Sequence, residues 1–131
     1  MTTVTFDQVV EKLNEAVQER GPDYVYVGPE GDRAVCLNWH EEQKEPGCIV
    51  GVVFHKLGFD WAHEMNYSSG YQLDTMTASS LLVHLKACGW QFDDYGKIDS
   101  LLSEIQAKQD RGVPWGEAVA EGREWARGEF S

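Results

Sequence analysis

Residues 48–57, Cys-Ile-Val-Gly-Val-Val-Phe-His-Lys-Leu, are the most apolar stretch of the chain. In so short a run, periodicity alone does not separate a buried helix from a buried strand. The β-branched residues favour a strand, whereas Pro46-Gly47 before the run and Leu57-Gly58 at its end favour a helix with a start and a stop. We predict a helix that is apolar on nearly every side and is therefore the most buried element of the fold.

Four further helices are predicted around this run, over residues 5–20, 78–88, 97–110 and 115–127. The first begins with the capping-box pattern of Thr5 and Gln8, and Thr77 is a suitable N-cap for the second. Apolar residues recur at helical spacing in these segments, which gives each helix one face for the core. Because residues 112–114 form only a short Gly-Val-Pro break, we expect the last two helices to be an antiparallel pair.

One β-hairpin is predicted between the first helix and the apolar run. Residues 24–27 and 34–39 are rich in β-branched and aromatic side chains, and turn-forming residues lie between them. We expect residues 40–47 to form a charged loop. Residues 59–73 are expected to form a second loop with one short helical turn at most.

The predicted fold class is α+β. It is a helix-rich single domain over residues 1–131, with one two-stranded β-hairpin packed against about five helices. A two-stranded sheet is not stable alone, so helices must cover its apolar face. Residues 1–4 and 127–131 are expected to fray.

The charge of the chain restricts the kinds of partner that it can bind. The chain has 22 Asp and Glu against 11 Lys and Arg, and its net charge is −11. This excess argues against direct binding of nucleic acid and against docking on an anionic membrane. No apolar run approaches the length of a transmembrane helix, and the start of the chain does not resemble a signal segment. We therefore expect a cytoplasmic protein.

The first predicted helix orders part of this charge into an acid row, which consists of Asp7, Glu11, Glu15 and Glu19. Their spacing of four residues places neighbouring carboxylates roughly 6 Å apart along the helix. That separation approximates the spacing of phosphates along one nucleic-acid strand. The row could imitate DNA or dock any protein partner with a basic surface. It could equally be a solvated face that only keeps a small protein soluble.

Aromatic residues in two predicted loops, residues 59–71 and 90–95, form a second candidate binding surface. The residues proposed for partner contact are Trp61, Tyr67, Tyr71, Trp90 and Tyr95. Protein interfaces are enriched in Trp and Tyr, because each buries a large area at low entropic cost. Core packing is the alternative role, since a domain of this size also needs aromatic residues inside.

Metal binding and thiol chemistry are weaker candidates. Cys36, His40, Cys48 and His55 are residue types that suit zinc, although their spacing matches no standard zinc motif. A Cys–His pair for nucleophilic catalysis could form from Cys48 or Cys88 with His84, and His84 and Cys88 lie four residues apart on one predicted helix. Packing of buried thiols is the alternative. We predict no catalytic residues and no cofactor.

Several short motifs resemble those of a family of small proteins from actinobacteria and their bacteriophages. The motifs cover most of residues 23–118 and are Asp-Tyr-Val-Tyr-Val at 23–27, Cys36, Pro-Gly-Cys-Ile-Val-Gly at 46–51, His-x-Leu-Gly at 55–58 and Gln-Asp-x-Gly-x-Pro-Trp-Gly-x-Ala at 109–118. The resemblance transfers no activity and no catalytic residues. It supports a helix at 48–57. A phage setting further implies a small acidic protein that binds and redirects a host protein.

The first hypothesis is therefore a non-enzymatic, phage-type accessory protein that binds a host or phage protein. It uses the acidic face of the helix at 5–20 and the aromatic loops, and it acts in the cytoplasm, which is the host's if a phage encodes it. The first alternative is a small metal-binding protein or Cys/His-dependent enzyme. The second is a structural homo-oligomer, in which exposed Trp115 and Trp125 pair between chains.

Overall fold

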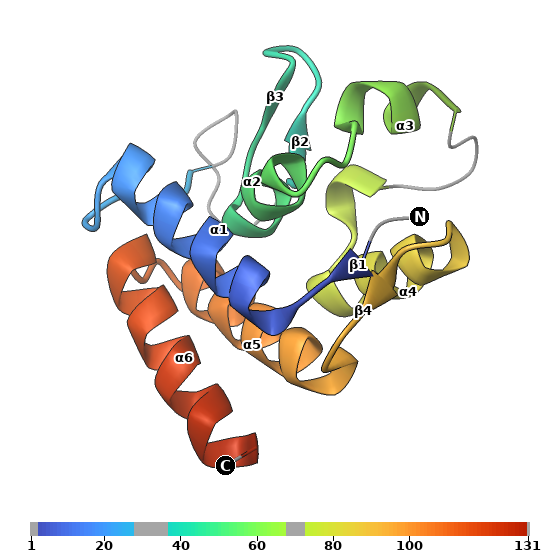
Figure 1. The fold of residues 1–131 in the computed structure, drawn as a ribbon. Helices are drawn as coiled ribbons and strands as arrows, with labels where there is room; N and C mark the ends of the chain where they lie inside the picture. Colours follow the sequence, from blue (N-terminus) through green and yellow to red (C-terminus); the bar gives the residue numbers. More distant parts are fainter. Residues whose placement is uncertain (1–2, 28–36, 68–72, 131) are drawn as a thin grey trace.

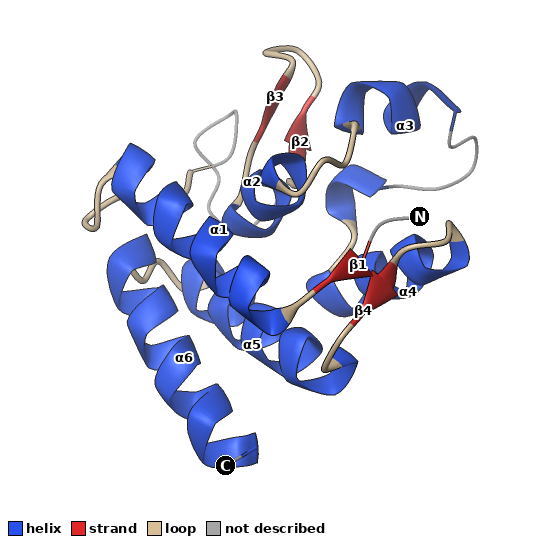
Figure 2. Cartoon of the chain, in the orientation of Figure 1, coloured by secondary structure: helices blue, strands red, loops and turns tan. Residues whose placement is uncertain are grey.

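The computed structural model describes residues 3–27, 37–67 and 73–130 (Figure 1). Its helices are α1 (Phe6–Arg20), α2 (Ile49–Lys56), α3 (Trp61–Tyr67), α4 (Ala78–Ala87), α5 (Tyr95–Asp110) and α6 (Trp115–Phe130), with the 3-10 turn η1 (Leu73–Thr75). Its strands are β1 (Thr3–Val4), β2 (Trp39–His40), β3 (Glu45–Pro46) and β4 (Gln91–Phe92). Helices dominate and the strands are short (Figure 2), so the predicted helix-rich α+β class is confirmed.

The apolar run forms the helix α2, as predicted. Every residue from Ile49 to Phe54 is buried, and α1 and α5 both pack against this helix. A helix enclosed by its neighbours can bury all of its sides, so it needs no polar face. None of the helices in the described ranges combines the length and apolar character needed to cross a membrane.

The helix α1 also begins as predicted. The Thr5 side chain accepts a hydrogen bond from the backbone N–H of Gln8 (3.1 Å), and the Gln8 side chain accepts one from the backbone N–H of Thr5 (2.9 Å). This reciprocal pair satisfies two backbone donors at the first turn. The inward face of α1 carries Val9, Leu13 and Ala16, which are fully buried.

The last two helices, α5 and α6, lie side by side and run in opposite directions (Figure 1), as predicted. Gly122 permits this close packing, because a Cβ there would lie 2.5 Å from Cγ1 of Ile105 on α5. Trp115 at the start of α6 is fully buried, whereas Trp125 is 41% exposed. Of these two tryptophans, only Trp125 therefore reaches the surface of the protein.

The predicted position of the β-hairpin is wrong. Residues 24–27 form no strand, and part of the segment 34–39 lies outside the described residues. The backbone carbonyls of Pro22 and Tyr24 instead accept hydrogen bonds from the N–H groups of Gly116 (2.9 Å) and Trp115 (2.8 Å). The first turn of α6 has N–H groups without partners inside the helix. Pro22 and Tyr24 supply acceptors for these groups, and residues 24–27 do not pair as a strand.

The antiparallel hairpin of the structure begins at Trp39, the last residue of the predicted strand 34–39, and otherwise lies in the predicted charged loop 40–47. Trp39 of β2 pairs with Pro46 of β3, and His40 pairs with Glu45. The Trp39 indole N–H donates to the Glu41 carboxylate (2.6 Å), and Lys44 makes an ion pair with the same carboxylate. Charged side chains of this loop therefore contact one another across its turn.

A second strand pair anchors the start of the chain. Val4 of β1 pairs in parallel register with Phe92 of β4, and the Val4 carbonyl accepts a hydrogen bond from the N–H of Asp93 (2.9 Å). Val4 is 1% exposed, so the expectation that residues 1–4 fray is wrong for its described part. At the other end of the chain, α6 continues to Phe130.

The region 59–73 holds more helix than the predicted loop with one turn. It contains α3 and the beginning of η1. Trp61 begins α3, is 1% exposed, and donates its indole N–H to the carbonyl of Gly51 in α2 (3.0 Å). This buried contact ties α3 to the central helix.

Two buried glutamines of α5 join it to other helices. Gln109 accepts hydrogen bonds from the backbone N–H of Ile49 (2.8 Å) and from the indole N–H of Trp115 (3.1 Å). Gln106 accepts one from the backbone N–H of Ala78 (2.9 Å). Ile49 and Ala78 are the first residues of α2 and α4, so each glutamine satisfies a helix-start donor that has no partner within its own helix.

Candidate functional site

The acid row lies on the solvent side of α1. Asp7, Glu11 and Glu19 are exposed, and Glu15 is half-buried. The side chains of Glu11 and Glu19 are 66% and 59% exposed. The structure therefore places this face where a partner can reach it.

Two lysines of the chain itself neutralise part of the row. Lys12 lies 3.1 Å from Glu15 and 3.7 Å from Glu11, and Lys56 of α2 contacts both Glu15 (3.8 Å) and Glu19. The hydrogen bond from Lys12 holds the pKa of Glu15 below its usual range, and the same contact raises the pKa of Lys12. The row is therefore a mixed-charge surface rather than a series of bare carboxylates.

The two aromatic segments meet, but they divide between core and surface. The ring centroid of Phe59 lies 4.7 Å from that of Trp61 and 6.1 Å from that of Trp90. Phe59 and Trp61 are buried, whereas Trp90 and Tyr95 are half-buried. The burial of Trp61 removes it from the residues that can contact a partner.

Two other aromatic candidates fall outside what the structure describes. These are the side chain of Tyr67 and the whole of Tyr71. The described surface part of the cluster consists of Trp90, Phe92 and Tyr95, and the ammonium of Lys86 lies 4.6 Å from the centroid of the Tyr95 ring.

Of the four candidate zinc ligands, the three that the structure describes do not converge. Cys48 and His55 lie at opposite ends of α2, about 10 Å apart along its axis, and zinc ligands must lie within about 2.3 Å of the ion. Cys48 is buried and donates its S–H to Asn38 Oδ1 (3.1 Å), and His40 contacts the Tyr26 hydroxyl. Cys36 lies outside the described residues. Elsewhere in the described ranges, no three His, Cys, Asp or Glu side chains gather in a way that could hold a metal ion.

The surroundings of His40 predict that the stability of the fold depends on pH. Burial holds the pKa of His40 below its usual range, and its Nε2 lies 2.9 Å from the Tyr26 hydroxyl oxygen. The folded state therefore favours the neutral ring, and this stabilisation is present above about pH 6.5 and lost as the pH falls through the lowered pKa. We expect the wild-type unfolding temperature to fall more than that of His40→Gln between about pH 7.5 and pH 5.

Thermal unfolding followed by circular dichroism at both pH values measures this difference. His55→Gln, which alters an exposed histidine, is the control and should keep the wild-type pH dependence. Identical pH dependence in wild type and His40→Gln would contradict the attribution of the pH dependence to the lowered pKa of His40.

The predicted pairing of His84 with Cys88 is present in the structure. Cys88 Sγ lies 3.6 Å from His84 Nε2, and Cys88 is exposed. Cys88 is also the C-cap of α4. The thiol and the imidazole are therefore close enough to contact each other, and the thiol is accessible from solvent.

Of the two tryptophans in the homo-oligomer hypothesis, Trp115 cannot contact a second chain. Trp115 is fully buried, donates its indole N–H to Gln109, and contacts the Tyr24 ring edge-on at 4.7 Å between centroids. It has no surface with which to meet a second chain. Trp125 remains available, since it is 41% exposed.

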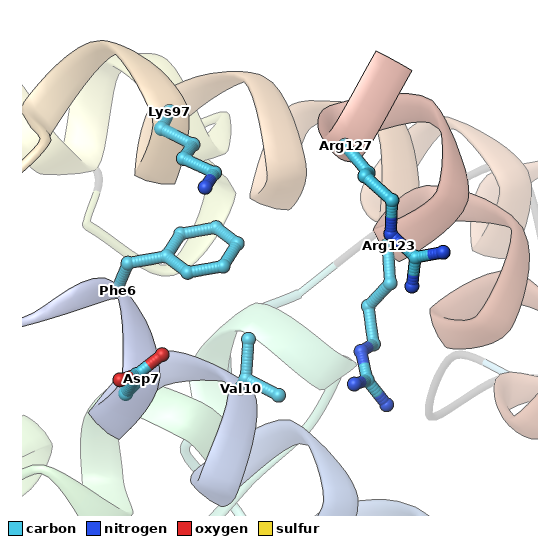
Figure 3. Close-up of a pocket in the computed structure, with 6 residues that line it drawn as sticks. All are labelled: Phe6, Asp7, Val10, Lys97, Arg123 and Arg127. Atoms are coloured by element: carbon cyan, nitrogen blue, oxygen red, sulfur yellow. The ribbon is translucent and has the colours of Figure 1, made fainter. Parts of the chain in front are cut away.

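Sequence reasoning missed a cleft of about 200 Å³ between α1, α5 and α6 (Figure 3). It is lined by Phe6, Asp7, Val10, Lys97, Arg123 and Arg127. The spacing of Arg123 and Arg127 places both on one face of a helix, and this was the available signal. Arg123 and Arg127 line the same cleft as Lys97 only because α6 packs on α5. Local sequence patterns do not encode this packing.

Comparisons of the chain with protein-family models, with curated proteins and with solved structures find no match. The resemblance to small actinobacterial and phage proteins therefore stays a prediction. The candidate sites rest on the exposures, distances and charges of the described residues.

Proposed function

We propose that the chain is a non-enzymatic binding protein that engages a protein partner with a basic surface through the acid row of α1. The observation that carries this proposal is the exposure of Asp7, Glu11 and Glu19 on a helix whose opposite face is core. The net charge of −11 supports it, because long-range attraction accelerates the approach of a basic partner.

The ion pairs of the row are compatible with binding. Pairs between lysine and carboxylate at a protein surface contribute little to stability, because water screens them. Arginine side chains of a partner can form bidentate contacts with the same carboxylates, so they can replace Lys12 and Lys56. The intramolecular pairs then hold the carboxylates in place until a partner arrives.

The surface aromatic residues extend the proposal. Trp90 and Tyr95 precede and begin α5, and Phe6 at the start of α1 lies beside Lys97 of α5. Half-buried aromatic residues near the start of the acid row are suited to anchor an interface. The predicted phage or actinobacterial setting, with a host or phage protein as the partner, belongs to this proposal.

Charge neutralisation on α1 tests the acid row. Glu11→Gln/Glu19→Gln should reduce capture of basic partners about fivefold or more, because both carboxylates are exposed and electrostatic attraction sets much of the association rate. The immobilised chain is incubated with lysate of its native host, and bound proteins are quantified by mass spectrometry. Raising the salt concentration should weaken wild-type capture more than capture by the variant.

Glu42→Gln/Glu117→Gln is the matched control, because it removes the same charge from exposed positions on the hairpin turn and on α6. It should capture the same proteins as the wild type. Equal losses in the two double variants would show that only net charge matters, and unchanged capture by Glu11→Gln/Glu19→Gln would exclude the acid row as the binding surface.

A further inference from the structure

The cleft between α1, α5 and α6 gathers positive charge in an acidic protein. Lys97 enters from the first turn of α5, and Arg123 and Arg127 enter from α6 (Figure 3). Among the described residues that line the cleft, Asp7 of α1 is the one carboxylate. Three cations against one carboxylate make the cleft positive, although acids outnumber bases two to one in the whole chain, 22 to 11.

In the part of the chain that the structure describes, two of these cations have no carboxylate partner. Within the described ranges, neither Lys97 nor Arg123 makes an ion pair, whereas Lys12, Lys56 and Lys108 each make two. Arg127 pairs with Glu124 (3.2 Å), and both side chains of that pair are well exposed. The cleft therefore holds cationic groups that are available for a ligand.

The position of Lys97 is not explained by the stability of α5. A cation in the first turn of a helix meets the positive end of the helix dipole and is destabilising there. The Lys97 ammonium instead lies 4.4 Å from the centroid of the Phe6 ring, which fixes it at the cleft. Phe6 thus positions a charge and provides an apolar wall at the same time.

The size and chemistry of the cleft define a ligand class. An engineered apolar cavity of about 150 Å³ holds a benzene ring, and this cleft measures about 200 Å³. The rings and methyl groups of Phe6 and Val10 supply apolar surface, and the guanidinium groups suit carboxylate or phosphate oxygens. We propose that the cleft binds a small organic anion, in which a carboxylate or phosphate is attached to an apolar body the size of one ring.

In this arrangement the anionic group lies between Lys97 and the two arginines, and the apolar body lies against Phe6 and Val10. Asp7 disfavours the anion by like-charge repulsion, so it limits affinity. The proposed ligand site shares Asp7 with the acid row but does not depend on the proposed protein-binding function, because its binding groups are the cations of α5 and α6.

Phenyl phosphate is the probe, and amide chemical-shift changes in ¹H–¹⁵N NMR spectra measure its binding. We expect a dissociation constant of about 1 mM, with shifts confined to α1, α5 and α6. Inorganic phosphate, which has no apolar body, should bind about fivefold more weakly. Lys97→Gln/Arg123→Gln should weaken phenyl phosphate binding about tenfold, because it removes two charge-assisted contacts.

Asp7→Asn should tighten binding two- to threefold, because it removes the repulsive carboxylate. This fold-change corresponds to about 0.5 kcal/mol of binding free energy. Lys44→Gln/Arg111→Gln is the matched control and should bind like the wild type, because it removes the same charge at exposed positions outside the cleft. If Lys97→Gln/Arg123→Gln disturbs the fold, Arg127→Gln alone supplies the test and should weaken binding about threefold.

Absence of shifts at about 10 mM phenyl phosphate would overturn the proposal. Shifts that map elsewhere, or equal weakening in the cleft and control double variants, would also overturn it. Equal affinity for phenyl phosphate and inorganic phosphate would overturn the inference that the ligand carries an apolar body.

Discussion

Gly51→Ala is expected to lower the free energy of unfolding by about 3 kcal/mol or more. Gly51 lies in the central buried helix α2, where a Cβ would be placed 1.9 Å from the backbone oxygen of Asn38 and 2.6 Å from its carbonyl carbon. The segment at Asn38 cannot easily move away, because it is bonded to Gly47 and to Asp74 through its backbone. The added methyl group must therefore displace one of two packed elements.

Chemical denaturation followed by tryptophan fluorescence measures this loss. Gly96→Ala is the matched control, since Gly96 also lies within a helix but a Cβ there would meet no atom within 4 Å. Alanine exceeds glycine in helix propensity, so the control should be unchanged or stabilised by up to about 1 kcal/mol. Similar stability of the Gly51 and Gly96 variants would refute the close approach of α2 to Asn38.

Gln109→Leu is expected to cost about 3 kcal/mol of stability. The Gln109 amide oxygen accepts hydrogen bonds from the backbone of Ile49 and from the indole of Trp115, and Gln109 itself is 1% exposed. Leucine keeps the approximate volume but removes the acceptor. Two buried N–H groups then lack their partner, and each such loss costs about 1–3 kcal/mol.

Two further variants form a graded series with this change. Gln106→Leu removes the acceptor of one backbone N–H, that of Ala78, so we expect about half the loss. Gln18→Leu alters an exposed position of α1 and should change stability by less than about 0.5 kcal/mol. Unfolding midpoints in denaturant rank the three variants. Any order in which Gln109→Leu is not the least stable would contradict the role of Gln109 in joining α2, α5 and α6.

The local elements were largely predictable. The capping box at Thr5 and the buried run at 48–57 gave the right helices, because capping and propensity act within a few residues. The hairpin was misplaced because strand propensity does not specify a pairing partner. The carbonyl of Tyr24 bonds Trp115, which is far away in the sequence, and no local pattern encodes such a contact.

The candidate sites likewise have one part that local spacing predicts and another part that depends on tertiary packing. The acid row of α1 follows from a four-residue spacing on one helix, and the structure places it on the surface as that spacing requires. Which aromatic residues are buried was not predictable, because Trp61 reaches the core only through the packing of α3 on α2.

The sequence by itself determined the helices other than α3, the capping box at Thr5 and the acid row, since each depends on interactions between residues that are near in the chain. The tertiary structure alone decided the strand pairs, the burial of Trp61 and Trp115, and the meeting of Lys97 with Arg123 in one cleft. These features arise when distant segments compete to bury apolar surface and to satisfy backbone groups. The outcome of that competition depends on the whole chain.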